Sequence, residues 1–303
     1  MKSKALIEKI LKLKNEKNAL ILAHNYQRGE IQDIADFTGD SLGLSRTAAG
    51  TDADLIVFCG VRFMAETVKI LSPDKTVLMP DPNAGCPMAD MITREGLRPL
   101  KQKHPGATVV GYVNTPADVK TEIDICCTSS NVIRVIESLD EKQEIIFVPD
   151  KYLADYVSRK TGRELIAWNG YCPTHVKILP EDITGSRARH PEAVVIVHPE
   201  CTPDVLNLAD EVFSTDGMVK YANSAAAREI IVGTETGIIH RLKKENPCKE
   251  FYPASENAIC PNMKLTTLEK VLWSLEDMKC EIILPREVLE GARKPVDRMV
   301  KLF

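Results

Sequence analysis

The strongest constraint on the fold of this 303-residue chain is an internal repeat, in which three copies of one pattern follow one another at spacings of 86 and 88 residues. Each copy ends in a loop where a cysteine precedes a proline, at Cys86, Cys172 and Cys260. The segments LILAHNYQRGE, VVGYVNTPAD and VVIVHPECTPD begin the three copies in the same register. Self-similarity at a fixed period constrains the architecture before any local assignment. We therefore expect three homologous units around a pseudo-threefold axis.

The repeat also brings polar residues into register at three further positions. Equivalent residues are again separated by 86 or 88 positions. They are His24, Tyr112 and His198 at the first position, Tyr26, Asn114 and Glu200 at the second, and Ser41, Ser129 and Thr215 at the third. Four positions that hold register across three copies are hard to obtain by chance.

Within the first copy, short apolar runs alternate with segments of helical periodicity. Strands are predicted at 19–26, 54–60 and 75–80, and helices at 31–37, 41–49 and 62–71. This alternation is typical of parallel sheets with right-handed crossover connections. The predicted fold class is α/β, with three homologous three-layer α/β/α domains whose parallel sheets are related by the pseudo-threefold axis. Ligands bind beyond the carboxyl ends of such strands, so the first two repeat positions should converge where the units meet.

The repeat also predicts the domain organisation. The first unit should comprise residues 1–92, the second 93–178 and the third 179–266, and units of this size can bury cores if they pack on one another. Residues 267–303 have no counterpart in the repeat. We expect them to form a C-terminal helical extension that packs back on the core, with one strand at 280–285.

Composition and charge exclude several classes of partner. The net charge of -4 provides neither a basic stripe for nucleic acid nor a polybasic patch for a membrane. Residues 1–18 are charged throughout and read as an amphipathic helix, not as a signal peptide or membrane span. We therefore expect a cytoplasmic protein whose partner is a small molecule.

Nine cysteines in that compartment should be mostly free thiols. Cys59 and Cys280 lie in apolar runs, where small thiols commonly pack in strands, and Cys248 is incidental in a charged turn. Three others lie near the expected site but each occurs in one copy only, which favours packing and leaves a functional role open. They are Cys126, Cys127 and Cys201.

The three repeated cysteines indicate a metal centre. Structural zinc usually takes four ligands, often in Cys-x-x-Cys pairs, and the sequence has no such pair. Three thiolates without an obvious fourth ligand better suit a 4Fe–4S cluster with one iron open to substrate. An open iron is a Lewis acid that can polarise a carboxylate or hydroxyl and help water to leave.

The Ser/Thr position adds a second chemical argument. Ser41, Ser129 and Thr215 each fall where a helix is predicted to begin, so three helix N-termini should face one cavity. Free amides at helix N-termini favour anions, which predicts binding of phosphate or carboxylates. The neighbouring Ser130 and Ser214 could add hydroxyl donors.

The motifs together resemble those of the quinolinate synthase family over essentially the whole chain. They are HNYQ at 24–27, GDS at 39–41, YVN at 112–114, TSSN at 128–131, HPEC at 198–201, STDGM at 214–218 and the three cysteine loops. The resemblance implies three α/β domains around a 4Fe–4S cluster on the central axis. It also implies that iminoaspartate condenses with dihydroxyacetone phosphate, with loss of phosphate and two waters, to give quinolinate for NAD synthesis.

The resemblance also implies roles for individual residues. Cys86, Cys172 and Cys260 would bind the cluster, and Glu200 would be the acid/base carboxylate. Tyr26, Tyr112 and His198 would share the proton transfers. Carboxylates or phosphate would be oriented by His24, Ser41, Asn114, Ser129, Ser214 and Thr215, with His175 near the substrate and cluster. Met263 and Lys264 are expected at the pocket floor, and His104, His190 and His240 at the surface.

The sequence predicts no disulfide switch, leaves two alternative functions open and suggests one functional coupling. The segment ICPNMKL has one cysteine where some relatives have Cys-x-x-Cys-x-x-Cys, so no disulfide switch is predicted there. Other functions compatible with such a centre are another iron–sulfur hydro-lyase acting on a small hydroxy acid, and a non-catalytic cluster-bearing sensor. Functional coupling to an enzyme that produces iminoaspartate is a further expectation.

Overall fold

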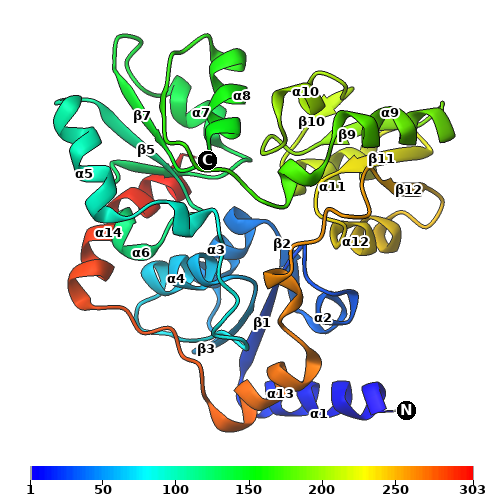
Figure 1. Cartoon of the computed structure of the whole chain (residues 1–303). Coiled ribbons are helices and arrows are strands. Elements are labelled where there is room, and N and C mark those ends of the chain that lie inside the picture. The colour runs from blue at the N-terminus through cyan, green and yellow to red at the C-terminus, as the bar shows by residue number, and fades with distance from the viewer. Residues whose placement is uncertain (1, 303) are drawn as a thin grey trace.

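The computed structural model describes residues 2–302 and contains three four-stranded sheets in which all strands are parallel (Figure 1). The strand orders are β2-β1-β3-β4, β6-β5-β7-β8 and β10-β9-β11-β12, which is one topology used three times. The strands of the first unit are β1 (Ala19–His24), β2 (Phe37–Gly39), β3 (Leu55–Cys59) and β4 (Thr76–Leu78). Those of the second are β5 (Thr108–Tyr112), β6 (Ile125–Cys127), β7 (Ile145–Val148) and β8 (Ile166–Ala167), and those of the third are β9 (Val194–Val197), β10 (Glu211–Val212), β11 (Glu229–Gly233) and β12 (Glu250–Pro253).

Helices connect successive strands in each unit, as the predicted alternation requires. The first unit contains α1 (Lys2–Glu16), α2 (Gly29–Ile34), α3 (Ser41–Gly50) and α4 (Arg62–Leu71). The second contains α5 (Arg94–Lys103), α6 (Ala117–Lys120), α7 (Val132–Glu137) and α8 (Lys151–Thr161), and the third α9 (Pro180–Arg189), α10 (Pro203–Leu206), α11 (Thr215–Ser224) and α12 (Ile238–Glu245). The predicted fold class, three α/β/α units with parallel sheets, is confirmed.

One aspartate per unit shows how closely the copies match. Asp36, Asp124 and Asp210 each follow the first strand of their sheet by the same distance in sequence, at gaps of 88 and 86 residues. Each carboxylate accepts a 2.8 Å hydrogen bond from a backbone amide of that strand, at Ile21, Val109 or Val195. A buried strand amide without a partner is costly, so this bond fixes the connection between the first and second strands.

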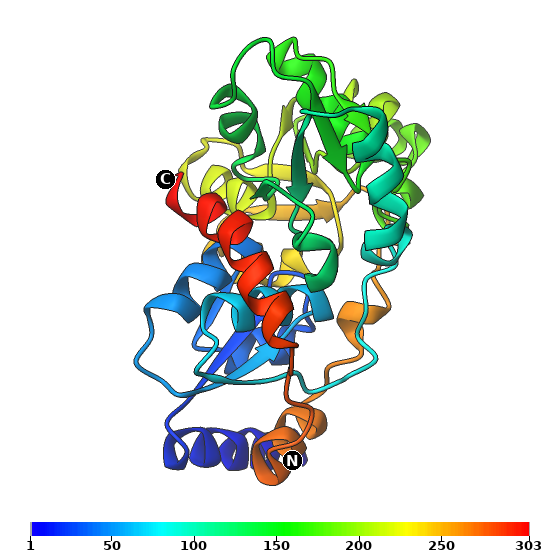
Figure 2. The same cartoon turned by 90° about the vertical axis from the view of Figure 1, so that its left-hand side faces the viewer.

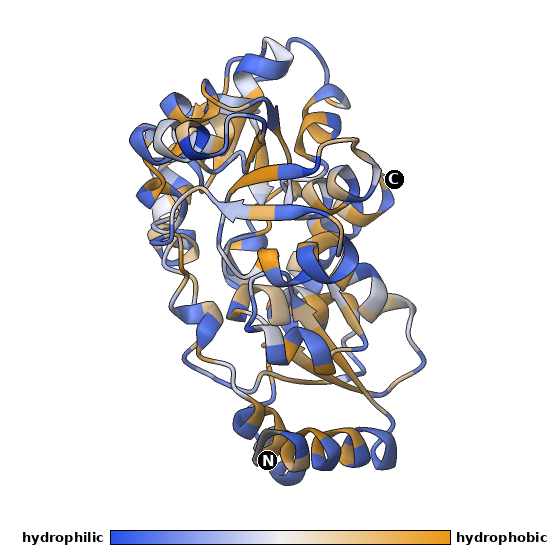
Figure 3. Ribbon diagram, turned by 90° about the vertical axis from the view of Figure 1, so that its right-hand side faces the viewer, coloured by the Kyte–Doolittle hydropathy of each residue, from blue (hydrophilic) through white to orange (hydrophobic). Residues whose placement is uncertain are grey.

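Apolar strands build the cores between the helical layers. All residues of β3 and β7 are buried, as expected for parallel strands covered on both faces. Figure 3 shows hydrophobic colours along most strands and mixed colours on the helices around them. Helix α1 buries Ile10 against α13 (Leu268–Asp277), so residues 2–16 form the predicted amphipathic helix.

The C-terminal residues cross between units. Helix α14 (Arg286–Lys301) packs against α4 of the first unit and against α6 and β6 of the second, as the red helix in Figure 2 shows. The predicted strand at 280–285 is wrong, because only Glu281 forms an isolated antiparallel bridge, to Leu78. Cys280 has a positive φ of 65°, which interrupts an extended backbone, and Ile283 is 76% exposed, so only Ile282 and Leu284 of this segment pack against the core.

The cysteines outside the repeat mostly have structural positions. Cys59 is buried in β3 as predicted, whereas Cys280 is exposed, contrary to its predicted packing. Cys248 is exposed in its turn. The other three are fully buried in the hydrophobic cores: Cys126, Cys127 and Cys201. None of the helices within residues 2–302 has the length and apolarity needed to cross a membrane.

Candidate active site

A central cavity lies where the three units meet. Thirteen of the fourteen predicted site residues line it. They are Cys86, Cys172, Cys260, His24, Tyr26, Ser41, Tyr112, Asn114, Ser129, His175, His198, Glu200 and Thr215. Met263 also lines the cavity, whereas Ser214 is set back from its wall.

The carboxyl ends of the first strands position three titratable side chains at the cavity. His24 and Tyr112 end β1 and β5, and His198 directly follows β9. In the first and third units the turn that follows the histidine is closed by the same hydrogen bond. The Tyr26 amide donates to His24 Nδ1 at 3.2 Å, and the Glu200 amide donates to His198 Nδ1 at 3.3 Å. The fold therefore aims repeated positions at one point.

Glu200 lies at the centre of this arrangement and is almost completely buried. Its Oε1 accepts a 2.6 Å hydrogen bond from the Tyr112 hydroxyl, and its Oε2 lies 2.8 Å from His175 Nδ1. Burial opposes ionisation, but the nearby His175 and His198 and the hydrogen bonds from His175 and Tyr112 outweigh it and lower the carboxyl pKa to about 2. Glu200 is therefore an ionised base at neutral pH.

A hydrogen-bonded chain continues from His175 to the first unit. Thr234 Oγ1 lies 2.8 Å from His175 Nε2 and 2.6 Å from the Tyr26 hydroxyl. Because a carboxylate only accepts, His175 Nδ1 donates to Glu200, and in the tautomer with its proton on Nδ1 the Nε2 atom accepts from Thr234. The Thr234 oxygen in turn accepts from Tyr26. One buried chain thus links Tyr26, Thr234, His175 and Glu200, with residues from all three units.

The neighbouring groups are held in definite protonation states. Burial lowers the pKa values of His24 and His198 to about 3, so both imidazoles are neutral at pH 7. Burial, reinforced by the Glu200 charge, raises the pKa values of Tyr26 and Tyr112 well above 10. Both phenols are therefore proton donors. The rings also support one another, since His175 stacks on His198 with centroids 4.7 Å apart.

Two helix N-termini, and not the predicted three, lie at the cavity. Ser41 is the first residue of α3, which Asp40 caps by accepting from Gly43 N at 2.7 Å. Thr215 is the first residue of α11, which Ser214 caps by accepting from Gly217 N at 3.2 Å. The prediction for Ser129 was wrong, because α7 begins at residue 132. Residues 128–131 instead form a turn closed by the Asn131 carboxamide, which accepts from the Thr128 amide at 2.7 Å.

Ser129 and Asn114 nevertheless face the cavity. Ser129 Oγ lies 3.3 Å from His198 Nε2. The Asn114 side-chain oxygen is buried and has no hydrogen-bond partner among residues 2–302, which is costly unless a ligand donates to it. The cavity wall therefore has polar groups suited to a polar small molecule.

The three cysteine loops have the same local structure. Each half-buried cysteine is followed by proline and then by a short 3₁₀ helix, η1 (Ala89–Met91), η2 (His175–Lys177) or η3 (Asn262–Lys264). The amides two and three residues after each cysteine lower the pKa of its thiol and so favour the thiolate: Met88 and Ala89 for Cys86, Thr174 and His175 for Cys172, Asn262 and Met263 for Cys260. Proline supplies no amide, so the first donor is two residues on.

These loops suit metal ions that replace the thiol protons. Burial raises the thiol pKa values, for Cys86 to about 12, so without a metal the thiols stay protonated. Metal binding would release those protons, and the donated amides would then stabilise the sulfur charge. In addition, the ligand atoms of Cys172, His175 and Glu200 lie within 4.8 Å of one another and could hold a metal ion.

The sequence did not single out Thr234 and Glu235, which are both buried beside this centre. They directly follow the apolar run EIIVG of β11, at the carboxyl end of a parallel strand. Their place at the end of a predicted strand could have identified them as site residues. However, only the third copy has these residue types at that position, so the repeat did not point to them. His175 is buried, whereas the three histidines predicted at the surface are partly exposed: His104, His190 and His240.

The fold and the site define a three-unit α/β protein whose repeated cysteines and acid/base side chains converge on one central cavity. The chain matches the family described as quinolinate synthetase A protein over residues 8–301, and it belongs to that family.

Curated relatives carry corresponding names. The quinolinate synthase of Dehalococcoides mccartyi strain CBDB1 is 57% identical over 97% of both chains. Quinolinate synthase 1 of Methanosarcina acetivorans is 54% identical over 99% of this chain and 98% of its own. The quinolinate synthase of Thermodesulfovibrio yellowstonii is 53% identical over 98% of both. These matches extend over nearly the whole chain.

Proposed function

We propose that this protein condenses iminoaspartate with dihydroxyacetone phosphate to form quinolinate, phosphate and two waters. The observation that carries the proposal is the convergence of three repeated cysteines with the Tyr26, His175, Glu200 and Tyr112 network in one cavity. The family and the names of its relatives support the product. The reaction needs groups that move protons and groups that hold anions, and the cavity wall has both.

Cys86, Cys172 and Cys260 are the proposed ligands of a 4Fe–4S cluster. The donor set fits this group, because one thiol comes from each unit and two amides per loop stabilise each thiolate. When bound, such a cluster with an open iron supplies a Lewis acid that favours loss of hydroxide. The protein contributes the ligand positions and the cavity into which they face.

Glu200 is the proposed acid/base group. As a buried carboxylate held by His175 and Tyr112, it can take a proton from a substrate carbon at neutral pH. Tyr26, Tyr112 and His198 are then proposed to complete the proton transfers, since the two phenols stay protonated and can donate to a leaving hydroxyl. A phenol that has donated must recover its proton, and the chain through Thr234 and His175 can return one from Glu200 to Tyr26 only after the Thr234 hydroxyl and the His175 tautomer reverse, because its hydrogen bonds point towards Glu200.

The remaining polar residues are proposed to orient the carboxylates and the phosphate. Ser41 and Thr215 offer hydroxyl and amide donors at the starts of two ten-residue helices, whose positive ends favour anions. His24, Asn114, Ser129 and His175 would complete this shell, and Ser214 would act indirectly by capping α11.

The substrates also suggest how the reaction is supplied. An imine of a small amino acid hydrolyses in water, so an oxidation that produces iminoaspartate should operate close to this protein. We include functional coupling to such an oxidase in the proposal. It predicts higher quinolinate yield when the imine is produced in the same solution than when it is added after a delay.

Mass spectrometry of quinolinate tests the proposed function directly. Protein purified and reconstituted without oxygen should give quinolinate only when both substrates are present, and exposure to air should stop the reaction. Protein that holds about four irons but gives no product would contradict the proposal. Dihydroxyacetone phosphate separates it from another hydro-lyase, because the phosphate should perturb the electron paramagnetic resonance spectrum of the reduced cluster only if it binds in this cavity.

A further inference from the structure

The loop that carries Cys260 is held against the first unit by contacts outside the proposed acid/base set. Three consecutive residues after β1 contact two consecutive residues of η3. The contacts are Lys264 Nζ to the Tyr26 carbonyl, Gln27 Nε2 to Met263 Sδ at 3.4 Å, and Arg28 Nε to the Lys264 carbonyl at 2.8 Å. These three contacts, called the interlock below, hold the third cysteine loop against the Tyr26 turn.

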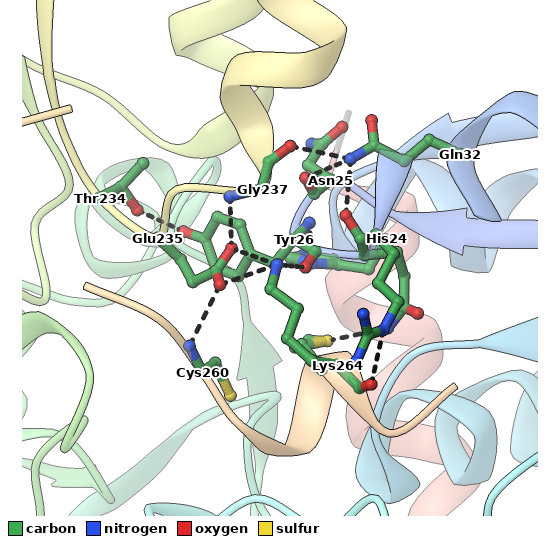
Figure 4. A network of polar contacts seen from close by, with 12 residues as sticks. His24, Asn25, Tyr26, Gln32, Thr234, Glu235, Gly237, Cys260 and Lys264 are labelled. Atoms are coloured by element: carbon green, nitrogen blue, oxygen red, sulfur yellow. Dashed lines mark hydrogen bonds and ion pairs between the residues drawn. The ribbon is translucent and has the colours of Figure 1, made fainter. Parts of the chain in front are cut away.

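Glu235 connects this interlock to the cysteine itself. Its side chain is fully buried, and its Oε1 accepts a 3.1 Å hydrogen bond from the Cys260 amide. Its Oε2 accepts from the Gly237 amide at 2.7 Å, and the Lys264 ammonium lies 2.9 Å from Oε1 and 3.1 Å from Oε2. Figure 4 shows the carboxylate between the Cys260 backbone and the Lys264 side chain. Both carboxylate oxygens thus have a backbone and a charged partner.

The packing around Gly237 shows how little freedom this arrangement has. A Cβ at Gly237 would lie 2.6 Å from Lys264 Nζ, 2.7 Å from the Tyr26 carbonyl oxygen and 2.8 Å from Glu235 Oε2. These three atoms belong to the Glu235–Lys264 pair and to the Tyr26 turn that Lys264 contacts. Glycine is therefore required at position 237 for the close approach and not for an unusual backbone angle. Residue 237 is therefore a position at which the pair can be disturbed without removal of any polar group.

A buried carboxylate that loses its cation is strongly destabilised, so Glu235 and Lys264 must move together. The carboxylate fixes the Cys260 amide, and the ammonium fixes the Tyr26 carbonyl. The cysteine of the third unit and the phenol of the first unit consequently keep one relative position. Chemistry at a shared site depends on such placement to within about 0.5 Å.

We propose that Glu235 and Lys264 are a positioning pair that sets the Cys260 thiol relative to the Tyr26 phenol. The pair acts through backbone atoms of these two residues and needs no contact with the substrate. The inference deepens the proposed function, since it rests on the roles given there to Cys260 as metal ligand and Tyr26 as acid.

Glu235 and Lys264 both belong to the third unit, whereas other ion pairs join the third unit directly to the first. Lys244 Nζ lies 2.6 Å from Asp33 Oδ1, but both side chains are exposed and neither contacts the cavity. Exposed pairs of this kind contribute little to stability. Lys244→Met is therefore the matched control for Lys264→Met, because it removes a lysine from an ion pair between the first and third units without touching the Cys260 loop.

The first test uses the full-length, metal-free protein and needs no cluster. Iodoacetamide labelling without oxygen, followed by peptide mass spectrometry, gives the alkylation rate of each cysteine. In Glu235→Gln, Lys264→Met and Gly237→Ala, the rate at Cys260 should rise several-fold. The rates at Cys86 and at the exposed Cys248 should stay at the wild-type values, as should all rates in Lys244→Met. If either single variant fails to fold, the double variant Glu235→Gln with Lys264→Met decides, because it removes both charges and leaves no unpaired carboxylate at the fully buried position 235.

Two results would overturn the proposal. One is an unchanged Cys260 rate in Lys264→Met and Gly237→Ala. The other is an equal rise at Cys86, Cys172 and Cys260, which would indicate general loosening of the fold instead of positioning of one loop.

A second test measures metal retention. After reconstitution with iron and sulfide, Glu235→Gln and Lys264→Met should release iron to a chelator about 10- to 100-fold faster than wild type, the usual effect of losing a partner of a metal ligand. Lys264→Arg should recover much of the difference, and Lys244→Met should match wild type. Equal release from all variants would refute the role in metal binding. If wild-type protein takes up no iron, the proposed function fails, and the alkylation rates still decide whether the pair positions Cys260.

Discussion

The hydroxyl of Tyr26 lies 2.6 Å from Thr234 Oγ1, so a residue of the first unit and a residue of the third share a buried hydrogen bond. The same threonine oxygen lies 2.8 Å from His175 Nε2, which belongs to the second unit. A single hydroxyl therefore joins the three units at the proposed site. The Thr234 hydroxyl accepts from the phenol and donates to His175 Nε2. The proton of the imidazole is therefore on Nδ1, the nitrogen that faces Glu200.

Thr234→Val should lower quinolinate formation by about tenfold or more. Valine has the same shape but removes the hydroxyl that bridges Tyr26 and His175, so the Tyr26 hydroxyl and His175 Nε2 keep only a long contact of 3.5 Å, and a buried polar group that loses its partner costs about 1–3 kcal/mol. Thr234→Ser keeps the hydroxyl and should retain most activity. The measurement is kcat for both variants, together with ¹⁵N spectra of labelled histidine to report the His175 tautomer. A valine variant with wild-type kcat would exclude this role.

Thr234 shows where prediction from the sequence ended. The repeat was sufficient to predict three parallel sheets and twelve residues of one cavity wall, because equivalent positions must fold alike, whereas His175 was predicted only from the family resemblance. It could not identify Thr234 or Glu235, which only the third copy carries. The errors have a similar cause: Cys280 and residues 280–285 lie outside the repeat, and Ser129 was assigned to a helix start by analogy although Asn131 locally replaces that start with a turn.

Glu200→Gln should reduce kcat by about 10²- to 10⁴-fold, the usual contribution of a general acid or base. An uncharged amide cannot take a proton from carbon, and its nitrogen would face a donor, either Tyr112 or His175. Iron content should remain, because the proposed cluster ligands are unchanged. The exposed Glu245→Gln is the control and should behave as wild type. Near-normal turnover in Glu200→Gln would assign the proton transfer to another group.

The stability of the metal-free protein should fall as the pH drops below about 6.5. Burial lowers the pKa values of His24 and His198 from 6.5 to about 3, so between these values the unfolded chain binds more protons than the native protein. The free energy of unfolding therefore rises with pH across this window. Glu200 acts in the same direction at lower pH, since its stabilising charge is lost as the pH falls from about 4.5 towards 2.

Urea unfolding between pH 4 and 7 measures this effect. His24→Gln and His198→Gln should each reduce the pH slope of the unfolding free energy by about one proton in the window. The double variant should remove about twice as much. Slopes that match wild type in both single variants would show that other groups cause the acid sensitivity.

Cys86→Ala should lose most of the bound iron and the activity together while the fold persists. The thiol is half-buried at the cavity wall, so its removal takes one proposed ligand from the cluster but little packing from the core. The melting temperature of the metal-free variant should therefore change by no more than about 4 °C, which corresponds to about 1 kcal/mol for a chain of this size.

Cys59→Ala is the matched control, because that thiol is fully buried in β3 and faces no cavity. It should lower the melting temperature and keep its iron. Activity without iron in Cys86→Ala would refute the Lewis-acid role, and equal loss of iron from both variants would show that iron is lost through a weakened fold and not through a missing ligand.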